Sequence, residues 1–315
     1  MTLQQLLDSQ SIIVIDGALA TELERHGADL QHNLWSAKYL LSEPERIEAV
    51  HVDYVRAGAQ ILITASYQAT VPGYIAAGFT EAQAHQAITA SVRVAQSARA
   101  RWALDNPASK TLPLIAGSVG PYGAYTADGG EYRGNYGLSH SQLLAFHMPR
   151  IATLVAAGVD FIACETIPDL IEAHALAACV AQFPDIGCWI AMSCRDGTTT
   201  NAGQSITRVA QELHVYESVV AIGVNCTPPQ YVASLVAQIA AHTTKPIVVY
   251  PNSGESYDAT TKTWSGTVRC ADYVAAAQTW VAAGARIIGG CCRTTPEHIR
   301  ALVDNFADQN PMFER

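Results

Sequence analysis

The chain has 315 residues, of which 49% are hydrophobic and 15% charged, and its formal net charge is -9. A chain of this length and hydrophobic content is enough for one large α/β domain or two smaller ones. The acidic balance, without any cluster of Lys and Arg, gives no support to nucleic-acid binding. Because there is no positively charged leader and no membrane-spanning stretch, we expect a soluble protein that is not exported and has no membrane partner.

Short apolar runs alternate eight times with longer helical patterns, which is typical of a parallel α/β fold. The predicted strands are 12–15, 60–64, 113–117, 159–164, 187–193, 219–224, 246–250 and 286–289. The predicted helices are 44–57, 81–104, 140–157, 169–182, 205–214, 229–242, 270–283 and 296–307. Eight such units predict one (β/α)8 TIM barrel domain over residues 1–315. A doubly wound open sheet is the alternative, but its glycine-rich dinucleotide turn is missing after the first strand, at Asp16-Gly-Ala-Leu-Ala-Thr-Glu.

In a parallel barrel, functional groups gather at the C-terminal ends of the strands. The residues at these ends are Asp16, Ser66 with Tyr67, Gly117-Ser118, Glu165, Ser193, Asn225-Cys226, Asn252 and Cys291-Cys292. Asp16 alone can be a helix cap, and Glu165 alone can be a solvated loop residue. Together with three sulfurs, the two carboxylates predict a recognition site for a ligand that carries an ammonium group. Ser66 and Asn225 are candidate substrate contacts at the same mouth.

Cys226 follows the sixth predicted strand, and the adjacent pair Cys291 and Cys292 follows the eighth. Neighbouring residues on a continuing strand point to opposite faces, but Gly289 and Gly290 let the backbone bend so that both sulfurs can turn inward. Three protein ligands leave a fourth tetrahedral position of zinc open, as in catalytic sites. These cysteines are therefore candidate Zn²⁺ ligands and catalytic residues, in a site that suits a thiol substrate.

Any one of the cysteines can instead be a small hydrophobic residue buried in the core. We adopt this interpretation for the cysteines that have no second cysteine at ligand spacing, namely Cys164, Cys179, Cys188, Cys194 and Cys270. Eight cysteines are too sparse for a disulfide scaffold in a chain of this length, and reduced thiols indicate the cytoplasm.

Other barrel chemistries fit less well. A Schiff-base aldolase needs a lysine at a strand end, and none of the four lysines lies at one. A phosphate-binding barrel stays open, because Gly289-Gly290, Arg293, Thr294 and a helix N-terminus can hold an anion, but it leaves the three cysteines unexplained. A Cys-His nucleophile pair needs a histidine near a strand end, and most of the ten histidines fall on helical patterns.

Five segments resemble the zinc-dependent homocysteine S-methyltransferase family over nearly the whole chain. They are Asp16-Gly-Ala, Thr64-Ala-Ser-Tyr-Gln-Ala-Thr, Ala163-Cys-Glu-Thr, Gly223-Val-Asn-Cys and Gly289-Gly-Cys-Cys-Arg-Thr-Thr-Pro. The resemblance implies a (β/α)8 barrel with Zn²⁺ on Cys226, Cys291 and Cys292. It also implies that Asp16 and Glu165 bind the amino group of homocysteine, whose sulfur accepts a methyl group to give methionine.

Residues 117–136 resemble the branch of that family that uses S-methylmethionine as methyl donor. This segment concentrates aromatic and acidic residues, and a sulfonium cation is attracted to both kinds of side chain: Tyr122, Tyr125, Tyr132, Tyr136, Asp128 and Glu131. We take Tyr125 as a donor contact and expect residues 119–139 to close as a lid, although glycine and tyrosine can also simply build an ordered loop. S-adenosylmethionine or betaine as donor, and a non-catalytic zinc- or thiol-binding barrel, stay open. The sequence does not indicate the oligomeric state.

Overall fold

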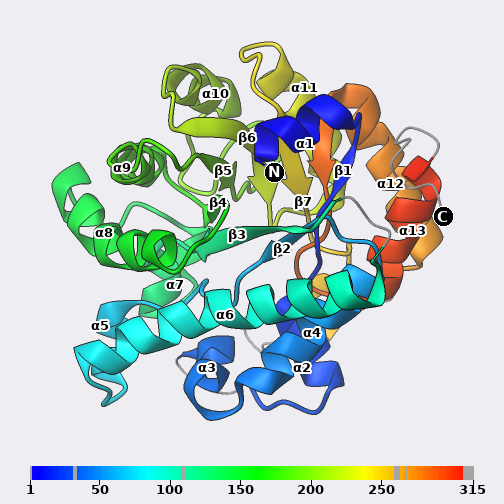
Figure 1. Ribbon diagram of the computed structural model, residues 1–315. Coiled ribbons are helices and arrows are strands. Elements are labelled where there is room, and N and C mark those ends of the chain that lie inside the picture. The colour runs from blue at the N-terminus through cyan, green and yellow to red at the C-terminus, as the bar shows by residue number, and fades with distance from the viewer. Residues whose placement is uncertain (1, 31–33, 108–110, 259–262, 267, 308–315) are drawn as a thin grey trace.

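The computed structural model describes residues 2–30, 34–107, 111–258, 263–266 and 268–307. Its main sheet has eight parallel strands in the spatial order β1-β10-β7-β6-β5-β4-β3-β2. In chain order they are β1 (Ile13–Val14), β2 (Ile61–Ile63), β3 (Leu114–Val119), β4 (Phe161–Ile167), β5 (Cys188–Met192), β6 (Val219–Asn225), β7 (Ile247–Tyr250) and β10 (Ala285–Ile288). A parallel bridge between Ile15 and Ile61 joins the two outer strands. The predicted TIM barrel is confirmed (Figure 1).

Each barrel strand is followed by a long helix that packs around the sheet. These helices are α4 (Pro44–Arg56), α6 (Glu81–Asp105), α8 (His140–Ala156), α9 (Leu170–Val180), α10 (Ile206–His214), α11 (Pro229–Ala240), α12 (Cys270–Ala283) and α13 (Pro296–Phe306). All eight predicted strands and all eight predicted helices are confirmed, with bounds that differ by a few residues. No helix of the described ranges has both the length and the apolar character that crossing a membrane requires.

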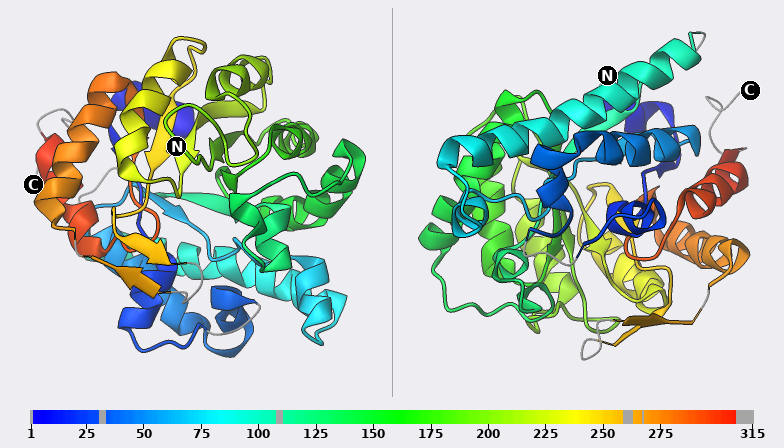
Figure 2. Two further views of the ribbon diagram at one scale, coloured as in Figure 1. Left: turned by 180° about the vertical axis from the view of Figure 1, so that it is seen from behind. Right: turned by 90° about the horizontal axis from the view of Figure 1, so that it is seen from below.

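Shorter elements that periodicity does not predict close the two ends of the barrel. They are α1 (Leu3–Ser9), α2 (Leu19–Arg25), η1 (Trp35–Lys38), α3 (Tyr39–Ser42), α5 (Val71–Ala76), α7 (Tyr122–Thr126), η2 (Gly130–Tyr132), β8 (Ser256–Asp258) and β9 (Thr263–Ser265). Helix α1 begins at a capping box formed by Thr2 and Gln5 and buries three leucines against the barrel interior. The β8–β9 hairpin lies at the opposite end (Figure 2).

Large side chains fill the interior of the barrel. Phe161 packs on Trp189 with ring centroids 5.0 Å apart, and Trp189 packs on Tyr250 at 5.9 Å. A second and larger apolar cluster lies between the sheet and the surrounding helices. Because the interior is packed, we look for a ligand site at the C-terminal ends of the strands, where barrels of this kind carry their functional groups.

Candidate functional site

Three cysteine sulfurs meet at the C-terminal mouth of the barrel. The Sγ atoms of Cys226, Cys291 and Cys292 all lie within 4.8 Å of one another, and those of Cys226 and Cys292 are 3.8 Å apart. Two sulfurs bound to one tetrahedral zinc ion at about 2.3 Å each are separated by about 3.8 Å, so this pair has the spacing of zinc ligands. An all-sulfur donor set also suits a soft metal ion. The residues present therefore fit a metal centre.

The same three sulfurs have a second possible state. In the structure Cys226 and Cys291 are joined as a disulfide, whereas Cys292 keeps its thiol. The structure thus shows these two sulfurs in a state that the expectation of fully reduced cysteines does not include. A sulfur that is bonded to another sulfur cannot act as a thiolate ligand, so the disulfide and a three-cysteine metal site exclude each other.

The backbone that turns the cysteine pair inward does so for a different reason than predicted. Gly289 and Gly290 do not have positive φ angles; they lack room for a side chain. A Cβ atom at Gly289 would lie 2.2 Å from a side-chain carbon of Ile15, and one at Gly290 would lie 2.3 Å from the hydroxyl oxygen of Thr294. The positive φ falls instead on Arg293, at 68°. The two glycines thus allow close packing of the strand ends, and Arg293 makes the bend.

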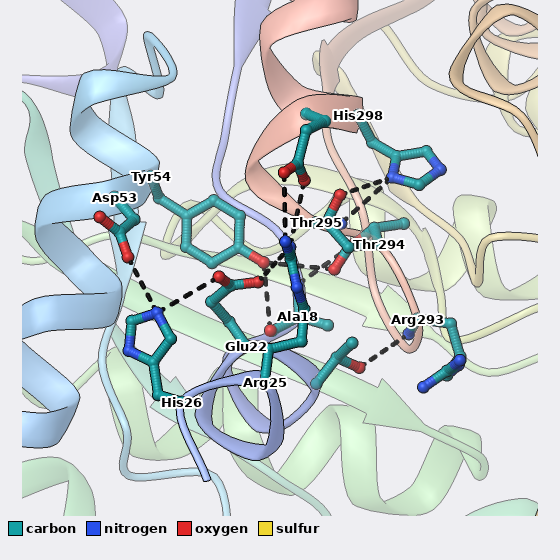
Figure 3. Close-up of polar contacts among 12 residues, drawn as sticks. Ala18, Glu22, Arg25, His26, Asp53, Tyr54, Arg293, Thr294, Thr295 and His298 are labelled. Atoms are coloured by element: carbon teal, nitrogen blue, oxygen red, sulfur yellow. Dashed lines mark hydrogen bonds and ion pairs between the residues drawn. The ribbon is translucent and has the colours of Figure 1, made fainter.

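The segment after the cysteine pair is anchored on the segment after β1 (Figure 3). The hydroxyl of Thr294 accepts a hydrogen bond from the backbone N–H of Ala18 at 3.2 Å, and the backbone N–H of Arg293 donates to the hydroxyl of Thr21 at 3.0 Å. The buried hydroxyl of Tyr54 lies 3.1 Å from the carbonyl of Ala18 and 3.3 Å from that of Thr294. These contacts fix the two cysteines relative to the β1 end of the mouth.

Glu165 is a buried carboxyl group at the mouth, on β4. Its Oε1 atom accepts a hydrogen bond from the hydroxyl of Ser118, and the hydroxyl of Tyr250 also donates to this carboxylate. Burial raises the pKa of Glu165 to about 7, although the two hydrogen bonds and the charge of Arg150 oppose the rise. A carboxyl group with this pKa is ready to lose its proton when a cation arrives, because the cation stabilises the charged form.

Asp16 is the second buried carboxyl group, directly after β1. Its Oδ2 atom accepts a hydrogen bond from the backbone N–H of Ile63 at 2.8 Å. Burial raises the pKa of Asp16 well above its usual value; the N–H of Ile63 opposes this, and repulsion from Glu165 adds to it. Since the charge of Glu165 acts on Asp16, the two carboxyl groups share one region of the mouth. Two buried carboxyl groups in one region form a site that favours a positively charged ligand group.

Asn225 holds the backbone beside Glu165. Its side-chain oxygen accepts from the backbone N–H of Thr166 at 2.6 Å, and its amide nitrogen donates to the hydroxyl of Thr166 at 2.8 Å. Thr166 has a φ of 61°, which is unfavourable for a β-branched residue. Both hydrogen-bonding ends of the Asn225 side chain are engaged in this way, so its place in the site is that of a positioning residue.

The remaining predicted contacts lie in supporting positions. Ser66 is fully buried, and its hydroxyl donates to the carbonyl of Ser118 at 2.7 Å, which ties β2 to β3 beneath Glu165. Tyr125, on α7, has a different environment. Within the described residues its ring neighbours are Tyr122 and Phe146, at centroid distances of 5.6 and 5.5 Å. The structure thus places Tyr125 in an aromatic cluster and gives it no contact with the three sulfurs.

Sequence reasoning missed two side chains, Arg150 and Tyr250, that hydrogen-bond to the loops and to the carboxylate at the mouth. Arg150, on α8, is almost completely buried and donates to the carbonyls of Tyr67 and Gly120 at 2.8 and 2.6 Å. It also lies 3.0 Å from Nδ1 of His147. An arginine within the apolar pattern of that helix was the available signal. Tyr250 carried none, because a tyrosine at the end of a strand is usually a packing residue.

The described chain contains one further group of possible metal ligands, Glu22, His26 and Asp53. Nε2 of His26 lies 3.5 Å from the carboxylate of Glu22 and 3.2 Å from that of Asp53. Arg25 occupies the same carboxylate of Glu22 at 2.9 Å. Since an arginine already supplies the positive charge, we interpret this group as an ion-pair network on the outside of the barrel (Figure 3).

Comparison with known proteins gives a consistent result. The sequence profile of a family described as homocysteine S-methyltransferase matches residues 13–306. A protein of Bacillus subtilis named homocysteine S-methyltransferase YbgG is 49% identical over 302 residues, which are 95% of this chain and 96% of that protein. The crystal structure of the metallated form of the homocysteine methyltransferase MmuM from Escherichia coli superimposes with a TM-score of 0.87 at 45% identity and covers 96% of this chain. The oxidised form of the same protein has the same TM-score and coverage at 46% identity, and both matches include 99% of the MmuM chain.

Proposed function

Because the chain belongs to the homocysteine S-methyltransferase family, we propose that it transfers a methyl group from S-methylmethionine to the sulfur of homocysteine. The methylated acceptor and the demethylated donor are then both methionine. The observation that carries the proposal is the convergence of three sulfurs and two buried carboxyl groups at one barrel mouth. Since the family consists of methyltransferases, a barrel that only binds zinc or thiols is the weaker hypothesis.

We propose that Cys226, Cys291 and Cys292 hold Zn²⁺ once the disulfide is reduced. Their sulfur spacing supports this assignment, and so does the metallated form of the Escherichia coli relative. When bound, zinc supplies a Lewis acid that makes the acceptor thiol available as a thiolate at neutral pH. Thiolate ligands stay reduced in the cytoplasm, which is where we propose that the protein acts.

The chain's own carboxyl groups bind and orient the acceptor in this proposal. The ammonium group of homocysteine lies against Asp16 and Glu165, and its charge lowers the pKa of both groups below their ligand-free values. Ser118 and Tyr250 hold the Glu165 carboxylate in a fixed orientation. Asn225 acts through the backbone beside Glu165. With the ammonium fixed, the acceptor sulfur points along one direction toward the donor.

The transfer itself needs no proton from the protein. The acceptor sulfur attacks the methyl carbon, the bond from that carbon to the donor sulfur breaks, and the electron pair stays on the donor sulfur, which leaves as a neutral thioether. Because a thiolate and a sulfonium neutralise each other, excluding water from the mouth favours the step. We propose that residues 119–139 do this as a lid; the backbone N–H of Asn135 donates to Asp169 after β4 at 3.0 Å, which ties this segment to the strand that carries Glu165. Tyr122 and Tyr125 belong to the same segment, and their ring faces suit a sulfonium.

The proposal is tested with reduced, zinc-loaded protein and homocysteine, supplied in parallel with S-methylmethionine, S-adenosylmethionine or betaine. We expect methionine to form with S-methylmethionine and little product with betaine. Turnover with betaine alone would replace the proposed donor. If no donor gives methionine in protein that holds one zinc ion per chain, the proposed reaction is wrong.

A further inference from the structure

One carboxylate oxygen in the long segment after β3 is buried without a hydrogen-bond partner. Glu131 lies in η2, in the long segment after β3, and its Oε2 atom is closed off from solvent and makes no hydrogen bond within the described residues. Burial raises the pKa of this carboxyl group, and its own backbone N–H only partly opposes the rise. A buried acceptor with no donor is costly, so an unpaired oxygen of this kind indicates a missing ligand.

The position of Glu131 is fixed by contacts on both sides. Its backbone carbonyl accepts a hydrogen bond from the hydroxyl of Ser193, at the end of β5, at 3.1 Å. On the other side, η2 packs directly on α7: a Cβ atom at Gly123 would lie 2.2 Å from the carbonyl carbon of Gly130. The backbone of Glu131 is therefore fixed between the end of β5 and α7 and does not belong to a loose loop.

The surroundings of Glu131 are those of the candidate site. The Ser193 hydroxyl that holds it also lies 3.4 Å from the carbonyl of Thr166, the residue after Glu165. Burial raises the pKa of Tyr67, and the negative charge of Glu131 adds to that rise, whereas a hydrogen bond with the side chain of Thr166 opposes it. Glu131 thus lies beside the backbone that follows Glu165, at the ends of β4 and β5.

The cations near the mouth are already paired. Arg133, two residues from Glu131, binds Asp128 at 2.7 Å and is largely exposed. Arg293 binds Glu255 at 2.6 Å. Arg150 is directed to backbone carbonyls and His147. The charge of Arg133 still partly opposes the raised pKa of Glu131, but Arg133 makes no hydrogen bond to the buried oxygen, so a cationic ligand is the partner that this oxygen lacks.

We propose that Glu131 is a specificity-determining residue of the methyl-donor subsite, where its free carboxylate oxygen contacts the positive charge of a sulfonium amino acid. The inference rests on the proposed methyl transfer. The donor loses its positive charge when it becomes a thioether, so the contact favours the donor over its product and is expressed mainly in the KM of the donor. A donor that presents its own carboxylate at this position is repelled, which disfavours betaine.

The test compares wild type with Glu131→Gln, Glu131→Asp and the matched control Asp128→Asn, which removes a carboxylate of the same loop that already has Arg133, Thr126 and Gly130 as partners. KM and kcat are measured separately for S-methylmethionine and homocysteine. We expect Glu131→Gln to raise the KM of the donor roughly ten- to a hundred-fold and to change the KM of homocysteine less than about threefold. Glu131→Asp should fall between wild type and Glu131→Gln, and Asp128→Asn should leave the KM of the donor within about threefold of wild type.

Three results would overturn this role for Glu131: an unchanged donor KM in Glu131→Gln, an equal rise in both KM values, or the same donor effect in Asp128→Asn. If Glu131→Gln does not fold, an unchanged donor KM in Glu131→Asp overturns it as well. Absence of turnover in wild type would instead mean that the proposed function is wrong. The two failures are therefore distinguishable.

Discussion

Replacing Glu165 by glutamine should stabilise the ligand-free protein while weakening its use of homocysteine. The pKa of Glu165 is about 7, compared with an ordinary value of 4.5. Because the folded-state pKa is raised, the unfolded chain loses its proton first, and the free energy of unfolding falls as the pH rises through this interval. At about 1.4 kcal/mol per pH unit, the loss amounts to about 3 kcal/mol by pH 8. Glutamine keeps the shape and does not ionise, so Glu165→Gln escapes this loss.

The thermal midpoint of reduced, metal-free protein, measured between pH 5 and pH 8.5, checks this expectation. We expect Glu165→Gln to melt about 5 °C above wild type at pH 8.5, with a difference that shrinks as the pH falls toward 4.5. The control Glu212→Gln removes a half-exposed carboxylate that is paired with Arg208, and it should change stability by less than about 1 kcal/mol. A variant that melts below wild type at pH 8.5 would show that Glu165 is already ionised and paired. In turnover assays, the KM of homocysteine should rise roughly tenfold or more.

Three further changes test other parts of the site. Cys292→Ser should lose bound zinc in elemental analysis, whereas Cys179→Ser, at a buried cysteine on α9, should keep it; equal zinc contents would refute the metal assignment. Asn225→Ala removes both hydrogen bonds to Thr166 and should lower the free energy of unfolding by about 2–4 kcal/mol; a loss below about 1 kcal/mol in denaturant titration would contradict its positioning role. Mild peroxide should remove two titratable thiols and abolish zinc uptake until dithiothreitol is added. Cys291→Ser should lose no such pair, and a loss of two thiols there would mean that another disulfide forms.

The barrel was predictable because its signals are local. Each strand is an apolar run of a few residues and each helix has its own periodicity, so eight repeats were visible without any knowledge of contacts. The rule that parallel strands share one functional end then brought Asp16, Glu165 and the cysteines together. The partners of these residues were not predictable in this way. Tyr250 donates to Glu165, 85 positions away in the sequence, and Arg150 donates to the carbonyl of Tyr67, 83 positions away. No pattern within one strand or helix encodes such pairs.

The backbone at the site is strained, and contacts with the rest of the fold hold it in that conformation. Thr166, Cys226 and Arg293 have positive φ angles without being glycine, and each lies within or next to a proposed functional residue. Such backbone conformations cost about 1–3 kcal/mol each and persist only when neighbours enforce them. Hydrogen bonds from neighbouring residues hold each of the three. The side-chain oxygen of Asn225 accepts from the N–H of Thr166, and the carbonyl of Tyr250 accepts from the N–H of Cys226 at 3.3 Å. The hydroxyl of Thr21 accepts from the N–H of Arg293. Because these contacts exist without substrate, the strained backbone is already in place before homocysteine arrives. Binding energy is then not needed to order the backbone. The remaining cost is the burial of the Asp16 and Glu165 carboxyl groups, and a cationic ligand offsets that cost when it binds.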